Sequence, residues 1–227
     1  MSLWTRITEA VSSLANGEGL SLVFERLRTP PERRVAFAIA VIALGAKMAK
    51  ADGQVTRGEV SAFREVFQIA KGDEAGAARV FNLARQDVAG FEEYATRIKA
   101  MFGDQTEALR DLLEGLFHIA MADGRYHPDE ALFLERVAEI FELPEHEFAR
   151  MRSRFVPDAA PDPYQVLDAS PEETTEALRK RYREMVRASH PDRMVARGVP
   201  VEAMRLAERR MVAINRAWAE ISAQRGI

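Results

Sequence analysis

The sequence has no cysteine among its 227 residues. This absence excludes a disulfide framework, a thiolate nucleophile and any zinc module with cysteine ligands. Excess charge is also lacking, because 32 basic residues stand against 35 acidic ones and leave a net charge of −3. No global field therefore attracts the chain to nucleic acid, and we expect no nucleic-acid partner.

Long apolar runs are scarce as well. The longest, VAFAIAVIALGA, covers residues 35–46 and is closed by Arg34 before it and Lys47 after it. A helix of that length reaches about 18 Å, whereas a bilayer span needs about 20 residues. The run therefore predicts a buried core helix, and we expect no transmembrane segment.

The N-terminal segment, residues 1–29, lacks the apolar stretch and cleavage site of a secretory signal. Leu3, Ile7, Val11 and Leu14 share one helical face, which predicts an amphipathic helix. We expect this face to dock on the protein itself; a homodimer contact or a weak membrane contact are the alternatives. The expected location is cytoplasmic, with peripheral association at the inner face of the membrane as the alternative.

Helical periodicity runs through nearly the whole chain. Apolar residues recur at steps of three and four, and no stretch sustains an alternation of period two, so we expect an all-α fold. The clearest break is FVPDAAPDPY, which contains three prolines. It predicts a linker over residues 155–162, between a helical domain at 30–154 and a smaller C-terminal domain at 163–227.

An internal repeat marks the first domain. AKADGQVTRGE at 49–59 returns 71 residues later as AMADGRYHPDE at 120–130. Each copy places an Asp-Gly turn between two apolar helical stretches, and glycine suits the left-handed conformation that commonly ends a helix. The repeat predicts a bundle in which two pseudo-repeated helix hairpins share one core.

The tripeptide His-Pro-Asp occurs twice, and its first copy lies in the second repeat. In YHPDE, His127 takes the cap position and Pro128 the first helical position, while Asp129 and Glu130 suit the positive end of the helix dipole. The other repeat has TRG at this place. We therefore interpret the first copy as a helix start with a purely structural role.

The second copy, SHPDR, follows a predicted helix that starts at the cap Ser170 and runs to about Ala188. Another long helix starts near Val201 and carries an apolar seam at steps of three and four residues: Met204, Ala207, Met211, Ile214, Trp218 and Ile221. The two helices predict an antiparallel hairpin, with a short helix at 164–167 against it. SHPDR would then lie in the loop at the tip of the hairpin.

The helix before SHPDR carries a basic stripe, in which arginines recur every four residues with a lysine beside them: Arg179, Lys180, Arg183 and Arg187. Such a stripe is usually a solvated face. Because it leads to a loop that a rigid hairpin presents to solvent, it can instead meet a partner.

The C-terminal segment, about residues 162 to 223, resembles the J domain of DnaJ-type co-chaperones. The matching residues are Tyr164, Leu167, Tyr182, Arg183, His190, Pro191, Asp192, Ile214, Asn215 and Ala217. The repeat domain resembles the TerB family, with its paired Asp-Gly turns. A TerB-like domain followed by a C-terminal J domain resembles the DjlA-like co-chaperones, and so does the long loop MVARGVP.

The resemblance implies a protein that binds a DnaK-type chaperone and stimulates its ATP hydrolysis without being an enzyme itself. His190, Pro191 and Asp192 would be the trigger. The basic stripe would be the electrostatic docking face, with Arg193 as a further member. Two positions depart from the family, since Glu184 replaces a common basic residue and Ser189 a common aromatic. The TerB-like domain would supply targeting, to a client that the sequence does not identify.

The acidic turns support an alternative interpretation of the repeat domain. If the repeats pack about a pseudo-two-fold axis, four carboxylates could hold a divalent cation: Asp52, Glu59, Asp123 and Glu130. Helix capping and the helix dipole explain the same residues without any cofactor. On the metal interpretation, the protein is a metal- or ligand-binding stress-sensing module that recruits a chaperone. No catalytic triad, phosphate loop or dinucleotide fingerprint occurs in the sequence.

Overall fold

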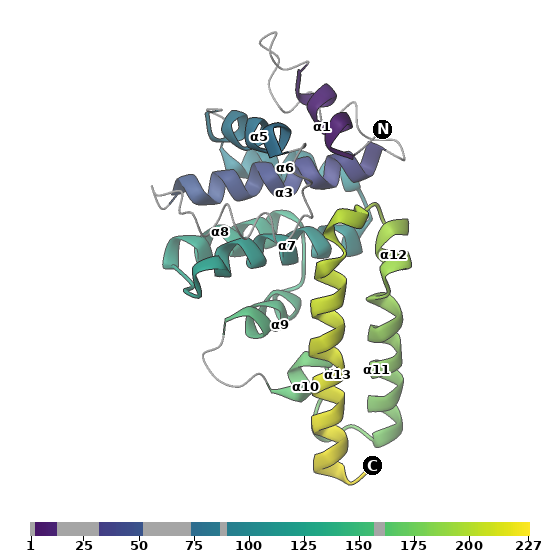
Figure 1. The fold of residues 1–227 in the computed structure, drawn as a ribbon. Coiled ribbons are helices and arrows are strands. Elements are labelled where there is room, and N and C mark those ends of the chain that lie inside the picture. The colour runs from purple at the N-terminus through teal and green to yellow at the C-terminus, as the bar shows by residue number, and fades with distance from the viewer. Residues whose placement is uncertain (1–2, 13–31, 52–73, 87–89, 157–161) are drawn as a thin grey trace.

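A computed structural model describes residues 3–12, 32–51, 74–86, 90–156 and 162–227 (Figure 1). Every regular element in these ranges is a helix, which confirms the predicted all-α fold. The α-helices are α1 (Leu3–Ser12), α3 (Glu32–Ala51), α5 (Glu74–Gln86), α6 (Phe91–Phe102), α7 (Thr106–Ala120), α8 (Pro128–Ile140), α9 (Glu145–Phe155), α10 (Pro163–Val166), α11 (Thr175–Ala188), α12 (Pro191–Ala196) and α13 (Arg205–Arg225). Two short 3-10 helices are η2 (Met121–Asp123) and η3 (Val201–Ala203).

The central helix of the larger part is α3, which contacts α1, α5, α6, α7 and α8. Its residues 35–44 are all buried, as the predicted core helix requires. Phe37 meets Phe102 of α6 edge to face, with ring centroids 6.5 Å apart, a favourable arrangement for two aromatic rings. Within the described ranges, no helix is long and apolar enough to cross a membrane.

The N-terminal helix α1 packs against α3 and α5. Ile7 is completely buried and Leu3 is partly buried against the same core. The prediction that this apolar face docks on the protein itself is therefore confirmed for these two residues. The other two members of the predicted face, Val11 and Leu14, lie outside the described side chains.

The second predicted helix hairpin is confirmed. Helix α7 ends in η2, Gly124 adopts the left-handed conformation with φ 79°, and α8 follows. His127 caps α8 and Pro128 is its first residue, as the sequence predicts. The Glu130 carboxylate accepts a hydrogen bond from the His127 backbone N–H at 3.1 Å, which satisfies one of the free donors at the helix start. The turn and second helix of the first hairpin fall at residues 52–73, outside the described ranges.

The predicted C-terminal hairpin is also confirmed. Helices α11 and α13 lie side by side in antiparallel directions, with α10 near the chain's C-terminal end (Figure 1). The hairpin encloses a small core of its own, formed by Val166, Leu167, Leu178, Ile214, Ala217 and Ile221.

One predicted boundary in the hairpin is wrong. Helix α11 begins at Thr175 and not near Ser170, because Thr174 is its cap and accepts the Ala177 backbone N–H at 3.2 Å. Ser170 instead donates its own N–H to the Glu173 carboxylate at 3.1 Å, within a turn before the helix. The capping pattern in the sequence is real, but it closes this turn.

Helix α13 serves two cores, which the sequence did not predict. From Ile214 onward, it supplies Ile214, Ala217 and Ile221 to the small core. Its N-terminal half supplies Leu206 and Ala207 to the large core around α3, together with Met194 of α12. The apolar seam is therefore continuous along the helix but is divided between two parts of the protein.

Candidate functional site

The second His-Pro-Asp begins a helix, just as the first copy does. His190 is the cap of α12 and Pro191 is its first residue. The prediction that the whole of SHPDR lies in a loop is therefore wrong. Proline has the backbone angle that a first helical position needs, and the His190 ring accepts the Asp192 backbone N–H through Nδ1 at 3.2 Å.

This hydrogen bond orients the imidazole of His190. With Nδ1 acting as an acceptor, the proton of the neutral ring sits on Nε2. The His190 side chain is 56% exposed and the Asp192 side chain is 91% exposed. One helix start thus presents an N–H donor and a carboxylate acceptor to solvent, next to each other.

The basic stripe lies on the helix that leads to His190. All of its members and Arg193 of α12 are exposed: Arg179, Lys180, Arg183, Arg187 and Arg193. None of them forms an ion pair with a carboxylate among the described residues. Arg181, on the same helix, differs because it binds the Glu173 carboxylate at 2.9 Å. On α11, Arg181 thus stabilises the turn that precedes the helix, and the basic stripe remains accessible to solvent or to a partner.

The residues that carry the J-domain resemblance also hold the hairpin together. Tyr182 of α11 stacks on Trp218 of α13 with ring centroids 5.0 Å apart, and its hydroxyl donates to the Asn215 side chain at 3.1 Å. Leu178 and Ile214 are completely buried in the small core. These contacts fix the direction of the basic stripe relative to α13.

The far end of the hairpin is fastened by Arg225. Its guanidinium lies over the Tyr164 ring, 5.5 Å from the centroid, and its Nε donates to the Tyr164 hydroxyl at 3.1 Å. It also donates to the Glu173 backbone carbonyl at 2.7 Å. Arg225 thereby joins α13 to α10 and to the turn before α11.

Buried charges join the hairpin to the larger part of the protein. Asp111 of α7 is completely buried, and its carboxylate accepts hydrogen bonds from Arg210 at 2.6 Å and from Arg197 at 3.0 Å. Arg197 also donates to the backbone carbonyl of Ala188 at 3.1 Å. Since Ala188 is the last residue of α11, Arg197 ties the chain immediately before His190 to α7.

A second carboxylate of α7 completes this contact. Glu114 is almost completely buried and accepts a hydrogen bond from Arg210 Nε at 2.8 Å. Burial opposes ionisation of Glu114, but Arg210 and Arg154 outweigh it and hold the pKa of that carboxyl below its ordinary value. Glu114 also helps to raise the pKa of Arg210, so both groups remain charged.

Sequence reasoning missed this buried network. A signal was present, because Asp111 and Glu114 are acidic residues one turn apart among the apolar residues of LRDLLEGLF. A buried carboxylate requires a cationic partner, and arginine is the usual one. The identity of the partners, Arg197 and Arg210, was not available from spacing because they come from a distant part of the chain.

The predicted metal ligands are only partly within view. Asp52 and Glu59 lie outside the described residues, and the side chain of Asp123 is not described either. Glu130 serves as the capping carboxylate of α8. In the described part of the chain, no group of three or more histidine, aspartate or glutamate side chains could hold a metal ion. The four-carboxylate site stays a prediction.

The sequence of the larger part matches a known family of proteins. A family model described as "Tellurite resistance protein TerB" matches residues 38–153, just over half of the chain. The chain belongs to this TerB family, as the paired turns in the sequence predicted.

Similarity to named proteins extends beyond the TerB segment. "Co-chaperone protein DjlA" of Vibrio parahaemolyticus is 25% identical, over 86% of this chain and 80% of its own. The protein of the same name in Vibrio cholerae is 24% identical over the same shares. That of Coxiella burnetii is 26% identical, over 77% of this chain and 72% of its own. No solved structure matches the chain.

Proposed function

We propose that the C-terminal hairpin is a J domain, and that the protein is a co-chaperone that binds a DnaK-type chaperone and stimulates its ATP hydrolysis. One observation carries the proposal. The exposed His190 and Asp192 stand at the end of a helix whose basic stripe has no carboxylate partner among the described residues. The similarity to proteins named co-chaperone DjlA, along most of the chain, supports the same conclusion.

The chemistry of the site suits a charged protein partner. The basic stripe would attract an acidic surface and speed the encounter, in a manner that salt weakens. His190 would then offer the N–H at Nε2, and Asp192 its carboxylate, to groups that the stripe has brought near. The hydrolysed ATP belongs to the partner, so the protein itself need not be an enzyme.

The TerB domain would direct this J domain to a target. Arg197 fastens the end of α11 to Asp111 of α7, so the hairpin and the TerB domain would move together. A target bound by the TerB domain would in this way be brought into a fixed relation to the chaperone. The five basic side chains at the chaperone-binding face are exposed in this arrangement.

The test is single-turnover ATP hydrolysis by a cognate DnaK-type chaperone with the full-length protein added. We expect His190→Gln to abolish the stimulation, because the glutamine cannot reproduce the oriented imidazole at the helix cap. His127→Gln is the matched control, since it changes the same residue in the other His-Pro-Asp. It should leave the stimulation unchanged.

Two results would count against the proposal. If the wild-type protein does not accelerate hydrolysis at any salt concentration, the hairpin is not an active J domain. If His190→Gln and His127→Gln lower the rate equally, the effect comes from lost folding and not from a specific trigger. Circular dichroism of both variants separates these cases.

A further inference from the structure

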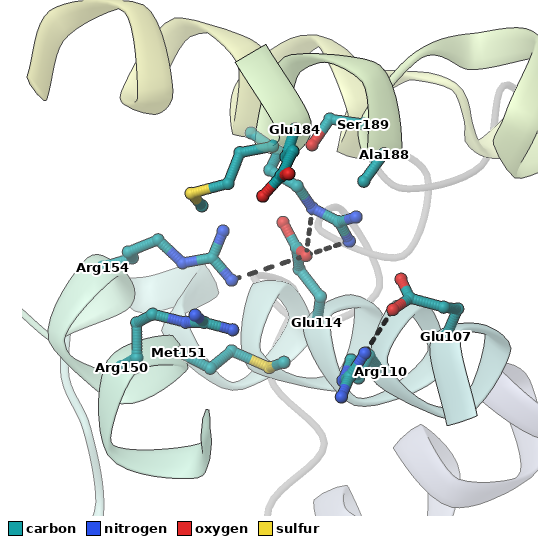
Figure 2. A pocket seen from close by; sticks show the side chains of 11 residues that line it. Glu107, Arg110, Glu114, Arg150, Met151, Arg154, Glu184, Ala188 and Ser189 are labelled. Atoms are coloured by element: carbon teal, nitrogen blue, oxygen red, sulfur yellow. Dashed lines mark hydrogen bonds and ion pairs between the residues drawn. The ribbon is translucent and has the colours of Figure 1, made fainter. Parts of the chain in front are cut away.

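A charged cavity of about 240 Å³ lies between the TerB domain and the hairpin. Helix α7 forms one wall, α9 a second, and the ends of α11 and α13 the others. Its charged lining residues are Glu107, Arg110, Glu114, Arg150, Arg154, Glu184 and Arg210. Figure 2 shows Arg150 and Arg154 reaching from α9 into the space opposite Glu184. The cavity is smaller than the roughly 300–1,000 Å³ of a drug-sized binding site, so only a small ligand would fit.

Three of the four arginines are closely paired with carboxylates. Arg110 binds the Glu147 carboxylate through two nitrogens and also contacts Glu107. Arg150 pairs with Asp168 at 3.0 Å. Arg210 pairs with Asp111 and Glu114, as described above. Arg110 and Arg210 are thereby neutralised by the protein itself, whereas Arg150 shares its partner Asp168 with Arg181, which lies 3.8 Å from the same carboxylate oxygen.

Arg154 is the exception. Its one ion pair among the described residues is with the Glu114 carboxylate at 3.7 Å. The same oxygen of Glu114 already accepts Arg210 Nε at the shorter distance of 2.8 Å. The Nε of Arg154 is buried and has no hydrogen-bond partner in the described structure. A single shared carboxylate oxygen therefore has to serve two guanidinium groups.

This arrangement is costly for Arg154. Its side chain is only 12% exposed, so water compensates its charge poorly. Burial lowers the pKa of Arg154, and the neighbouring charges of Arg210 and Arg150 act in the same direction. A buried cation without a full hydrogen-bonding partner destabilises a protein unless an anion reaches it.

Among the described carboxylates that line the cavity, Glu184 is the one that has no cationic partner of its own. It is therefore the one that could neutralise Arg154 without breaking another ion pair. It belongs to α11 and is exposed, and it lies across the cavity from Arg154 (Figure 2). It forms no ion pair with any described residue. Because of its position at the rim, the Glu184 carboxylate would compete with an entering anion for Arg154. Removing its charge should therefore strengthen anion binding.

We propose that this cavity binds a small phosphate-type oxyanion, either free phosphate or the phosphate group of a small phosphomonoester, held by Arg154 and Arg150. A guanidinium presents a planar fork of N–H donors that matches the oxygens of a phosphate group. The bound anion would supply the missing partner of Arg154. Because the walls come from the TerB domain and from α11, it would also link the two parts next to Ser189.

The site is tested by isothermal titration calorimetry of the full-length protein without any chaperone, so the result does not depend on the proposed co-chaperone activity. Inorganic phosphate is one titrant and glycerol phosphate the other, each at constant ionic strength in chloride. The titrant with the lower dissociation constant shows whether the site prefers free phosphate or a phosphomonoester. We expect saturable binding that Arg154→Gln and Arg150→Gln each weaken about tenfold or more, because each removes a charged donor.

Two further variants make the test specific. Arg152→Gln is the matched control, because Arg152 lies on the same helix α9 but does not line the cavity. It should bind phosphate like the wild type. Glu184→Gln removes the competing carboxylate and should tighten binding severalfold.

The proposal is overturned if neither titrant gives saturable heat. It is also overturned if Arg152→Gln weakens binding as much as Arg154→Gln, since the loss would then reflect general charge. Arg150→Gln and Glu184→Gln change less buried residues, so they keep the test valid if Arg154→Gln does not fold.

Discussion

His127 and His190 occupy the same local position, because each caps a helix whose first two residues are proline and aspartate. What separates them is the third residue of each helix and its surroundings. Glu130, after the first copy, is buried and bonded back to the His127 N–H. Arg193 takes that position after the second copy, and it is exposed beside the basic stripe. The same tripeptide therefore begins a helix in both places, and the second copy adjoins exposed basic side chains.

The basic stripe should control the rate at which the protein meets its chaperone. We expect Arg183→Gln to lower the association rate severalfold at low salt and to flatten the dependence of that rate on salt concentration. Stopped-flow binding to a DnaK-type chaperone measures both quantities. Arg216→Gln is the control, since Arg216 is exposed on α13 and lies outside the stripe. Equal effects of the two changes would contradict a role for the stripe.

Arg210 should be important for stability because it serves two buried carboxylates. Its removal in Arg210→Ala leaves Asp111 and Glu114 without their main partner, and loss of one member of a buried ion pair typically costs about 3–5 kcal/mol. Urea denaturation measures the free energy of unfolding. The exposed pair of Arg136 with Glu139 provides the contrast, and Arg136→Ala should leave the free energy of unfolding nearly unchanged.

The pH dependence of stability should contain a contribution from Glu114. Its pKa is lowered in the folded protein relative to the ordinary 4.5, so the folded state gains stability from the ionised form. That gain is complete above pH 4.5 and is lost as the pH falls through the lower folded pKa. We expect the stability difference between wild type and Glu114→Gln to be largest near neutral pH and to shrink below pH 4.5. A difference that grows on acidification would show the opposite linkage.

Gly198 should resist substitution for two reasons. Its φ is 97°, which disfavours any residue with a side chain, and a Cβ there would lie 3.2 Å from the Cβ of Arg33. We expect Gly198→Ala to destabilise the protein by about 1–3 kcal/mol in thermal or urea denaturation. Gly103→Ala is the comparison, because Gly103 also has a positive φ but has open space around it. It should cost less.

Tyr126 gives a prediction of the opposite sign. Its hydroxyl is buried and has no hydrogen-bond partner among the described residues, and burial raises its pKa to about 12. Its ring stacks on Phe117, which a phenylalanine would preserve. Tyr126→Phe should therefore stabilise the protein by about 1 kcal/mol, because it removes a desolvated polar group. A loss of stability in urea denaturation would indicate that the hydroxyl is satisfied in solution.

Local rules in the sequence predicted much of the fold because they act over one or two helical turns. The cap at His127, the left-handed Gly124 and the buried run of α3 all follow from short patterns. The start of α11 was misplaced by four residues, since Ser170 and Thr174 both satisfy capping rules and only packing decides between them. The pairing of Asp111 with Arg197 and Arg210 could not be predicted, because it depends on how the hairpin lies against α7.

For the candidate site around His190, the sequence predicted the residues but not the helix α12 that begins at Pro191. Its histidine, aspartate and arginines are near one another in sequence, so their proximity required no knowledge of the tertiary fold. The helix α12 was missed because six residues carry too weak a periodic pattern to be recognised. The cavity beside Arg154 was missed for a different reason, since its walls come from four helices.

The division of α13 between two cores has a practical consequence for dissecting the molecule. A fragment cut at the proline-rich break would carry Met194 and Leu206 away from the apolar surface that covers them. The fragment would expose apolar side chains at the same end of the hairpin as His190. A chaperone that recognises unfolded segments would then bind the fragment as a substrate. Exchanging the hairpin together with α7 between relatives keeps this apolar contact intact. Such an exchange is therefore the better way to separate the contribution of the hairpin from that of the TerB domain.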